Sequence, residues 1–153
     1  MSLEARATTM PDEARMPDKA RRLESARAAP PLATVLVIDD DPAMVESLAL
    51  MLEDHGFRVL TAIGGVRGLQ VFREQGPAAV LTDILMPEQD GIGAIMTMRR
   101  ERPAVKIIAV SGAGRIGKSD FLTVARKLGA DATFEKGQNA GELVELLKAV
   151  LAR

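Results

Sequence analysis

The chain has 153 residues, of which 47% are apolar and 27% are charged. This length fits one ordinary domain with some chain to spare, and the apolar content is sufficient for a buried core. Twenty basic and 21 acidic residues leave a net charge of -1. That balance excludes the broad positive surface needed for nonspecific binding to nucleic acids or anionic membranes, so we expect no nucleic-acid partner.

The residue types that are absent or rare exclude further classes of site. The chain has no cysteine and a single histidine, which excludes disulfides, thiolate zinc sites and polyhistidine metal sites. No apolar run approaches the roughly 20 residues that cross a bilayer, and the N-terminus has no apolar signal stretch. We therefore expect a cytoplasmic protein without membrane insertion.

Residues 1–33 differ in composition from the rest of the chain. They combine four prolines with alanines and charged residues and contain almost no large apolar side chain. Such a segment cannot bury a core, so we predict a mobile N-terminal leader at 1–33 and one folded domain at 34–153. Between Asp18 and Ala28, alanine, arginine, leucine and glutamate favour a transient helix, although no consistent apolar stripe runs along it.

From Thr34 onward, short β-rich runs alternate with helical patterns. In chain order, the predicted strands are 35–38, 59–62, 79–81, 106–110 and 132–134, and the predicted helices are 43–55, 66–74, 92–100, 120–128 and 140–151. The central strands read as continuous runs of Val, Ile and Leu, which indicates burial on both faces. We therefore predict an α/β fold, a doubly wound five-stranded parallel sheet with helices on both faces.

The helices carry signals for their ends and their buried faces. Asp41 is placed to cap the first helix, and Pro42 suits its first position. In the last helix, the predicted core stripe comprises Leu143, Leu146, Leu147 and Val150. Val144 and Leu151 extend beyond this stripe and indicate a contact surface. We interpret Arg99, Arg100 and Arg102 as the solvated end of a helix.

Carboxylates follow two of the predicted strands. Asp39 and Asp40 end the first strand and Asp83 ends the third, so all three reach the same edge of a parallel sheet. Clustered carboxylates repel one another unless a cation neutralises them, and Mg²⁺ prefers such hard oxygen ligands. Considered alone, Asp39 and Asp40 fit a helix-capping turn as well as they fit a metal site.

The third strand continues into the sequence Asp-Ile-Leu-Met-Pro-Glu-Gln-Asp-Gly at 83–91. Together with the acidic pair Asp39-Asp40, the strand-end Ser111 and the strand-end Lys136, this block makes residues 34–153 resemble the receiver domain of two-component response regulators. The order and spacing of these motifs match that family. The resemblance implies a flavodoxin-like sheet with strand order 2-1-3-4-5, as in the chemotaxis response regulator.

The same resemblance implies a phosphorylation site. Asp83 is the implied phosphoacceptor, which takes a phosphoryl group from the phosphohistidine of a histidine kinase or from a small phosphodonor. Lys136 and Ser111 are the implied partners of the phosphate oxygens. The implied Mg²⁺ ligands are the side chains of Asp40 and Asp83, the backbone carbonyl of Leu85 and, directly or through water, Asp39.

Two positions depart from the family pattern. Gly137 follows the lysine where family members usually have proline, which puts the placement of Lys136 in doubt. Thr133 replaces the aromatic residue whose rotation usually accompanies phosphorylation. We expect the neighbouring Phe134 to pack in the core, because alternation along a strand points it to the other face.

Two other classes of function remain open from the sequence. Residues Gly112 to Ser119 satisfy the phosphate-loop pattern G-x-x-x-x-G-K-[ST], in which Lys118 would reach nucleotide phosphates and Ser119 would bind magnesium. The loop follows the fourth strand, so this hypothesis requires a permuted nucleotide-binding protein. The third hypothesis is a receiver-shaped interaction module that is never phosphorylated.

The predicted last helix reaches the end of the chain at Arg153, so we expect a stand-alone receiver that signals by protein contact or by phosphorelay. We expect no enzyme activity beyond its own Mg²⁺-dependent aspartyl phosphorylation and dephosphorylation. The expected partners are a sensor histidine kinase or phosphotransfer protein, an unidentified downstream protein, and a second copy bound through the helix at 120–128, the strand at 132–134 and the helix at 140–151.

Overall fold

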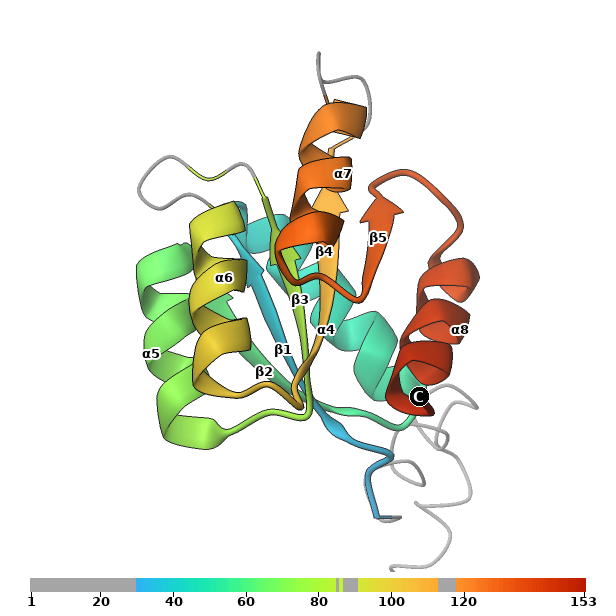
Figure 1. Ribbon diagram of the computed structural model, residues 1–153. Coiled ribbons are helices and arrows are strands. Elements are labelled where there is room, and N and C mark those ends of the chain that lie inside the picture. The colour runs from blue at the N-terminus through green and yellow to red at the C-terminus, as the bar shows by residue number, and fades with distance from the viewer. Residues whose placement is uncertain (1–29, 85, 87–90, 113–117) are drawn as a thin grey trace, which may run out of the picture.

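The computed structural model describes residues 30–84, 86, 91–112 and 118–153, and the side chains of all of these except 118–122. In this part of the chain, strands and helices alternate (Figure 1). The strands are β1 (Thr34–Asp39), β2 (Arg58–Ile63), β3 (Ala79–Asp83), β4 (Lys106–Ser111) and β5 (Ala132–Glu135). The helices are α4 (Pro42–Asp54), α5 (Gly65–Gln75), α6 (Gly91–Glu101), α7 (Lys118–Leu128) and α8 (Ala140–Leu151).

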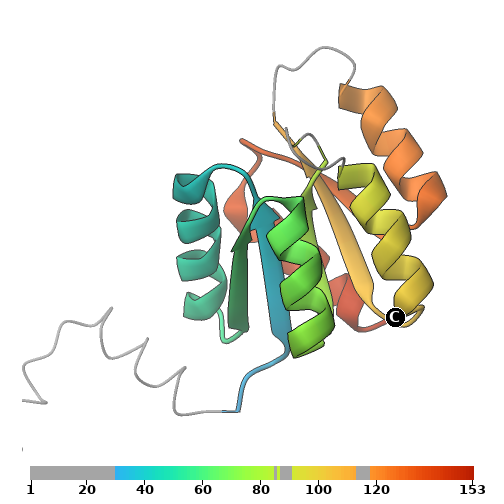
Figure 2. The same ribbon diagram turned by 90° about the vertical axis from the view of Figure 1, so that its left-hand side faces the viewer.

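The strands form one parallel sheet in the order β2-β1-β3-β4-β5. Helices α4 and α8 cover one face of this sheet, and α5, α6 and α7 cover the other (Figures 1 and 2). The predicted doubly wound fold with strand order 2-1-3-4-5 is therefore confirmed. All the predicted strands and helices are present, and their observed ends differ from the predicted ones by at most two residues.

The pleat of β1 shows how the sequence supplies both cores. Val35 and Val37 point to the core under α4 and α8, whereas Leu36 and Ile38 point to the core under α5, α6 and α7. Full burial of each such side chain stabilises the fold by about 1.5–3 kcal/mol. The same alternation gives Asp39, the next residue, the side that Val35 and Val37 use.

The start of α4 follows the predicted capping pattern. The carboxylate of Asp41 accepts a hydrogen bond from the backbone N–H of Ala43 at 3.0 Å, and Pro42 occupies the first helical position. This cap supplies an acceptor to a backbone donor that the helix itself leaves unpaired. The carboxylate of Asp39 accepts a hydrogen bond from the backbone N–H of Asp41 at 3.0 Å, so Asp39 and Asp41 both support this turn.

The prediction of a solvated arginine patch was wrong for two of its three members. Arg100 is exposed, but the half-buried side chain of Arg99 forms an ion pair of 2.6 Å with Asp131. Arg99 also donates hydrogen bonds to the carbonyl oxygens of Pro103, Val105 and Gly129. The guanidinium of Arg102 stacks 4.2 Å above the ring of Phe72. Arg99 therefore ties α6 to neighbouring loops, and Arg102, the residue after α6, ties the end of this helix to α5.

The predicted core stripe of α8 was also partly wrong. Val144 is buried with Leu143, Leu147 and Val150, whereas Leu146 is only partly buried. The position of α8 over β4 and β5 rotates Val144 inward and Leu146 outward, and the helical period alone does not specify that rotation. The surplus apolar residue assigned to a contact surface therefore belongs to the core. Of the helices in the described ranges, none has the length and apolar character to span a membrane.

Candidate functional site

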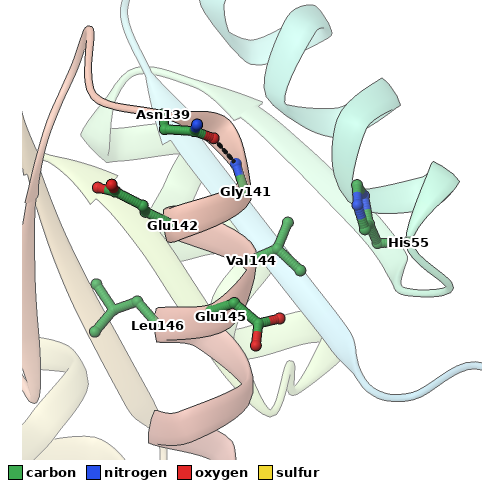
Figure 3. A pocket seen from close by; sticks show the side chains of 7 residues that line it. All are labelled: His55, Asn139, Gly141, Glu142, Val144, Glu145 and Leu146. Atoms are coloured by element: carbon green, nitrogen blue, oxygen red, sulfur yellow. Dashed lines mark hydrogen bonds between the residues drawn. The ribbon is translucent and has the colours of Figure 1, made fainter.

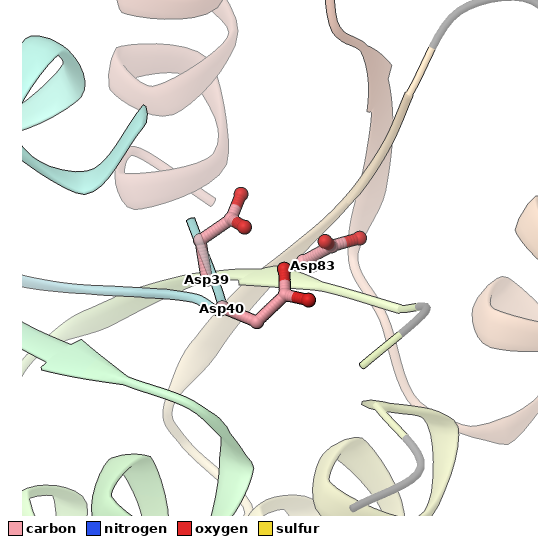
Figure 4. A group of neighbouring side chains, drawn as sticks. All are labelled: Asp39, Asp40 and Asp83. Atoms are coloured by element: carbon pink, nitrogen blue, oxygen red, sulfur yellow. The ribbon is translucent and has the colours of Figure 1, made fainter. Parts of the chain in front are cut away.

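Three carboxylates meet at the carboxyl edge of the sheet. Asp39 ends β1, Asp83 ends β3, and Asp40 is the first residue after β1. One oxygen from each carboxylate lies within 4.8 Å of the others (Figure 4). Asp39 and Asp83 are each only 2% exposed, whereas Asp40 is exposed to solvent. The site therefore has two buried acidic groups and one accessible one.

The register of the sheet brings these residues together. Strands β1 and β3 are direct neighbours, with Ile38 opposite Thr82, so the residues that follow both lie at the same rim. Helix α6 then approaches the end of β3 so closely that a Cβ atom on Gly91 would overlap the carbonyl oxygen of Asp83 and the Cα of Ile84. The motif at 83–91 includes Gly91 but does not predict this contact. The glycine at the start of the predicted helix was the signal in the sequence for such a close approach of two backbones.

Lys136 carries the positive charge of the site. Its Nζ lies 2.6 Å from Oδ2 of Asp39 and 3.3 Å from Oδ2 of Asp83, and its side chain is 17% exposed. The backbone N–H of Lys136 donates to the carbonyl of Ser111 at 2.7 Å, which continues the pairing of β5 with β4. An ammonium group thus bridges two buried carboxylates from two different strands.

The charges in the site shift one another's protonation. Burial raises the pKa of Asp39, but the Lys136 ammonium, the N–H of Asp41 and the neighbouring Asp40 outweigh it and hold this pKa below its ordinary value. Burial and the adjacent Asp39 carboxylate raise the pKa of Asp40. Burial lowers the pKa of Lys136, but its carboxylate partners outweigh this and raise the pKa above its ordinary value. One ammonium group therefore stabilises Asp39 as an anion but leaves Asp40 under repulsion.

Ser111 lies at the end of β4 and is fully buried. Within the described part of the chain, its hydroxyl has no hydrogen-bond partner. The pleat gives Ser111 the side of the sheet opposite to that of Val110, which packs in the core under α4 and α8. Asp83 is in register with Val110, the residue before Ser111, so the ends of β3 and β4 lie side by side. Leaving a buried hydroxyl unpaired costs about 1–3 kcal/mol, so this group is available for a ligand.

The positions that depart from the family pattern have clear structural settings. Phe134 is buried in the core under α4 and α8, as predicted, and Thr133 is half-buried on the other side. Gly137 has a φ of 95°, a conformation that proline cannot adopt. A glycine rather than a proline therefore suits this form of the loop.

Some of the predicted site residues lie outside the described part of the chain. Leu85, whose carbonyl was an implied metal ligand, is one of them, and so are residues 113–117 of the phosphate-loop pattern. Helix α7 begins at Lys118, but the side chains of Lys118 and Ser119 are not described. The nucleotide-binding hypothesis gains no support from the described residues.

A family model of the response regulator receiver domain matches residues 35–148. The chain belongs to this family. Among curated relatives of the receiver, the probable transcriptional regulator ycf27 of Pyropia yezoensis is 34% identical over 119 residues, which cover 78% of this chain and 47% of the relative. The sensor kinase CckA of Brucella abortus is 34% identical over 125 residues, which cover 80% of this chain and 13% of that protein. The receiver thus spans less than half the length of these relatives.

Solved structures of receivers have the same fold. A receiver domain protein from Clostridium thermocellum is 30% identical, with a TM-score of 0.74 over 80% of this chain and 96% of its own. A CheY-like receiver domain protein from Methanospirillum hungatei is 31% identical, with a TM-score of 0.70 over 79% of this chain and 94% of its own. This membership favours the receiver over the permuted nucleotide-binding protein.

Proposed function

We propose that Asp83 accepts a phosphoryl group from the phosphohistidine of a sensor histidine kinase or phosphotransfer protein, or from a small phosphodonor. The observation that supports this proposal is the cluster of three carboxylate oxygens within 4.8 Å of one another, with Lys136 bridging Asp39 and Asp83. A carboxylate beside fixed positive charge is suited to nucleophilic attack on phosphorus.

In the proposed reaction, an oxygen of Asp83 attacks the phosphorus atom of the donor. A P–O bond forms as the P–N bond to the donor imidazole breaks, and the bonding electron pair leaves with the imidazole. Lys136, already 3.3 Å from the Asp83 carboxylate, pairs with an oxygen of the transferred group. The hydroxyl of Ser111, buried and unpaired among the described residues, donates a hydrogen bond to another oxygen. Both groups act on charge that grows as the phosphoryl group arrives.

The donor set suits a magnesium ion held by Asp39, Asp40 and Asp83. All three are hard oxygen donors, which Mg²⁺ prefers, and burial together with the neighbouring Asp39 carboxylate raises the pKa of Asp40, which a bound cation would offset. When bound, Mg²⁺ supplies positive charge that neutralises the carboxylates and the transferring phosphoryl group. The proposed further ligand, the carbonyl of Leu85, lies outside the described residues.

The receiver is further proposed to act in the cytoplasm as a folded unit at 34–153, preceded by a leader at 1–33, with no enzymatic activity beyond its own phosphorylation and dephosphorylation. Its proposed output is contact with a downstream protein or onward phosphotransfer. A second copy could bind through α7, β5 and α8, and the exposed apolar side chains of Val124 and Leu128 on α7 support such a contact. Sedimentation of a Val124→Lys variant with and without phosphorylation tests that surface.

The acceptor is tested by incubating the full chain with acetyl phosphate and Mg²⁺ and measuring the intact mass. We expect one added phosphate, which is lost in Asp83→Asn and after removal of Mg²⁺ by EDTA. Lys118→Ala, which alters the phosphate-loop pattern and leaves the acidic cluster intact, serves as the control and retains the modification. Phosphate still added to Asp83→Asn, or none added to the parent, contradicts the proposal.

A further inference from the structure

A groove runs between the end of α4 and the first turns of α8, away from the acidic site. Its volume is about 740 Å³. The lining residues are His55, Asn139, Gly141, Glu142, Val144, Glu145 and Leu146. Figure 3 shows Val144 and Glu145 on the side of α8 that faces His55, so these two helices form the walls.

The groove combines an apolar floor with an acidic rim. Val144 belongs to the core, and the partly buried Leu146 points to the other side of α8 (Figure 3). Glu142 is exposed, and Glu145 is 77% exposed with only a loose contact of 3.9 Å to Lys148 on the same helix. Nδ1 of the His55 ring lies 2.8 Å from the carbonyl oxygen of Met51, and His55 lines the α4 side of the groove. The groove therefore suits an occupant with positive charge around a small apolar centre.

The leader carries a segment of that chemistry. Residues 18–28 read Asp-Lys-Ala-Arg-Arg-Leu-Glu-Ser-Ala-Arg-Ala, with four basic and two acidic side chains. At the helical spacing that this composition favours, Lys19, Leu23 and Arg27 share one face. This face has a single leucine between two basic residues.

The leader joins the folded domain beside the groove. The backbone N–H of Leu32 donates to the carbonyl of Gly56 at 2.9 Å, and the Leu32 side chain lies against Gly56, the residue after His55. Only four peptide steps separate Ala28 from Leu32, a reach of at most about 14 Å. An 11-residue helix would be about 16 Å long. Residues 18–28 are thus held within reach of the groove.

We propose that residues 18–28 bind in the groove between α4 and α8, with Leu23 on Val144 and the basic side chains beside Glu142 and Glu145. The short tether makes this contact intramolecular, at an effective concentration of the order of millimolar, so individually weak contacts are sufficient. The occupied groove covers Asn139 and Gly141, which closely follow Lys136 in the chain. The leader therefore competes with a protein that docks on the acidic rim of this groove, but it does not compete with a small phosphodonor.

A spin label on the leader tests the contact in the full chain. Because the chain has no cysteine, Ser25→Cys provides a unique attachment site. We expect the label to broaden the amide resonances of Val144 and Glu145 in ¹⁵N spectra. The broadening should disappear in Glu145→Lys and persist in Glu74→Lys, an equal charge reversal on an exposed residue of α5 on the opposite face. It should also weaken in 1 M salt, where the Debye length falls to about 3 Å.

Three outcomes overturn the proposal. The first is the absence of broadening at the groove, and the second is an equal loss of broadening in both charge-reversal variants. The third is broadening of ¹⁵N-labelled parent chains that are mixed with spin-labelled chains containing no ¹⁵N, because this marks contact between copies. The measurement involves no phosphorylation, so its failure leaves the proposed phosphoacceptor untouched. Failure of Asp83 to accept phosphate likewise leaves the groove contact intact.

Discussion

Replacing Lys136 with methionine tests whether the acidic cluster needs a cation. The substitution keeps an unbranched stem of similar length but removes the ammonium that lies 2.6 Å from Asp39 and 3.3 Å from Asp83. Both carboxylates are 2% exposed, so water does little to replace the lost charge. In metal-free buffer, the two buried anions are left facing each other.

The expected loss of stability follows from this burial. Removing one partner of a buried ion pair costs about 3–5 kcal/mol, and the 17% exposure of the Lys136 side chain favours the lower end of that range. At about 4 °C per kcal/mol for a domain of this size, the melting temperature should fall by about 12 °C. Calorimetry or urea unfolding in EDTA measures the change.

Magnesium should stabilise the Lys136→Met variant more than the parent. In the parent, a metal competes with the ammonium for Asp39 and Asp83, whereas in the variant this competitor is absent. A ligand at 100 times its dissociation constant stabilises a protein by about 2.7 kcal/mol, so the tighter-binding variant gains more at any given concentration. Melting temperatures measured across a Mg²⁺ titration compare the two gains.

Lys148→Met is the matched control. Lys148 is 48% exposed, its contact with Glu145 is 3.9 Å, and it lies far from the acidic cluster in the chain. Its replacement should change stability by no more than about 0.5 kcal/mol and leave the response to Mg²⁺ unaltered. If both methionine variants unfold alike in EDTA, or Mg²⁺ stabilises Lys136→Met and the parent equally, the assumed electrostatics of the site are wrong.

Three further predictions concern the supports of the site and its pH dependence. Arg99→Met should lower the free energy of unfolding in urea by about 2–4 kcal/mol, because it leaves partly buried acceptors without a donor. The exposed Arg100→Met should lower it by no more than about 0.5 kcal/mol, and similar losses in the two variants would contradict the role assigned to Arg99. Gly91→Ala should slow phosphorylation by acetyl phosphate by up to about 10²-fold, because the new methyl group displaces the backbone of Asp83, the proposed acceptor. An unchanged rate of phosphorylation, measured by mass spectrometry, would disprove this role of the close contact. The lowered pKa of Asp39 makes its contribution to stability complete above its unfolded value of about 3.9 and lost as the pH falls through the folded value. The raised pKa of Lys136 makes its contribution complete below about 10.4 and lost as the pH rises through the folded value. In Lys136→Met the buried carboxylates lose their cation and take up protons more readily, so the stability lost relative to the parent should shrink as the pH falls from about 7 to 5, and a loss that grows over that range would refute the pairing.

The architecture of the receiver follows from patterns that are local in the sequence. Apolar runs, helical periods and the Asp41 cap each depend on neighbouring residues, and they suffice for the order of strands and helices. The buried strands imply a parallel sheet, and a parallel sheet brings the residues after Asp39 and Asp83 to one rim. The acidic cluster was thus predictable as a meeting of strand ends before any contact was measured.

Contacts across the fold depend on distances that no local pattern contains. Arg99 and Arg100 are chemically alike and adjacent, but only Arg99 reaches Asp131, because the turn after α7 returns to that side of α6. Val144 and Leu146 are equally apolar, and the orientation of α8 over the sheet decides which one is buried.

The sequence alone therefore determined the α/β class, the positions of the strand-end carboxylates and the candidate roles of Asp83 and Lys136. Only the tertiary structure decided that Lys136 bridges Asp39 and Asp83, that the buried Ser111 hydroxyl has no partner among the described residues, and that Gly91 lies against the backbone of Asp83. The physical reason is the separation along the chain over which each interaction acts. Periodicity and capping act over a few residues of chain, whereas ion pairs, burial and close backbone contact arise between segments that only folding brings together.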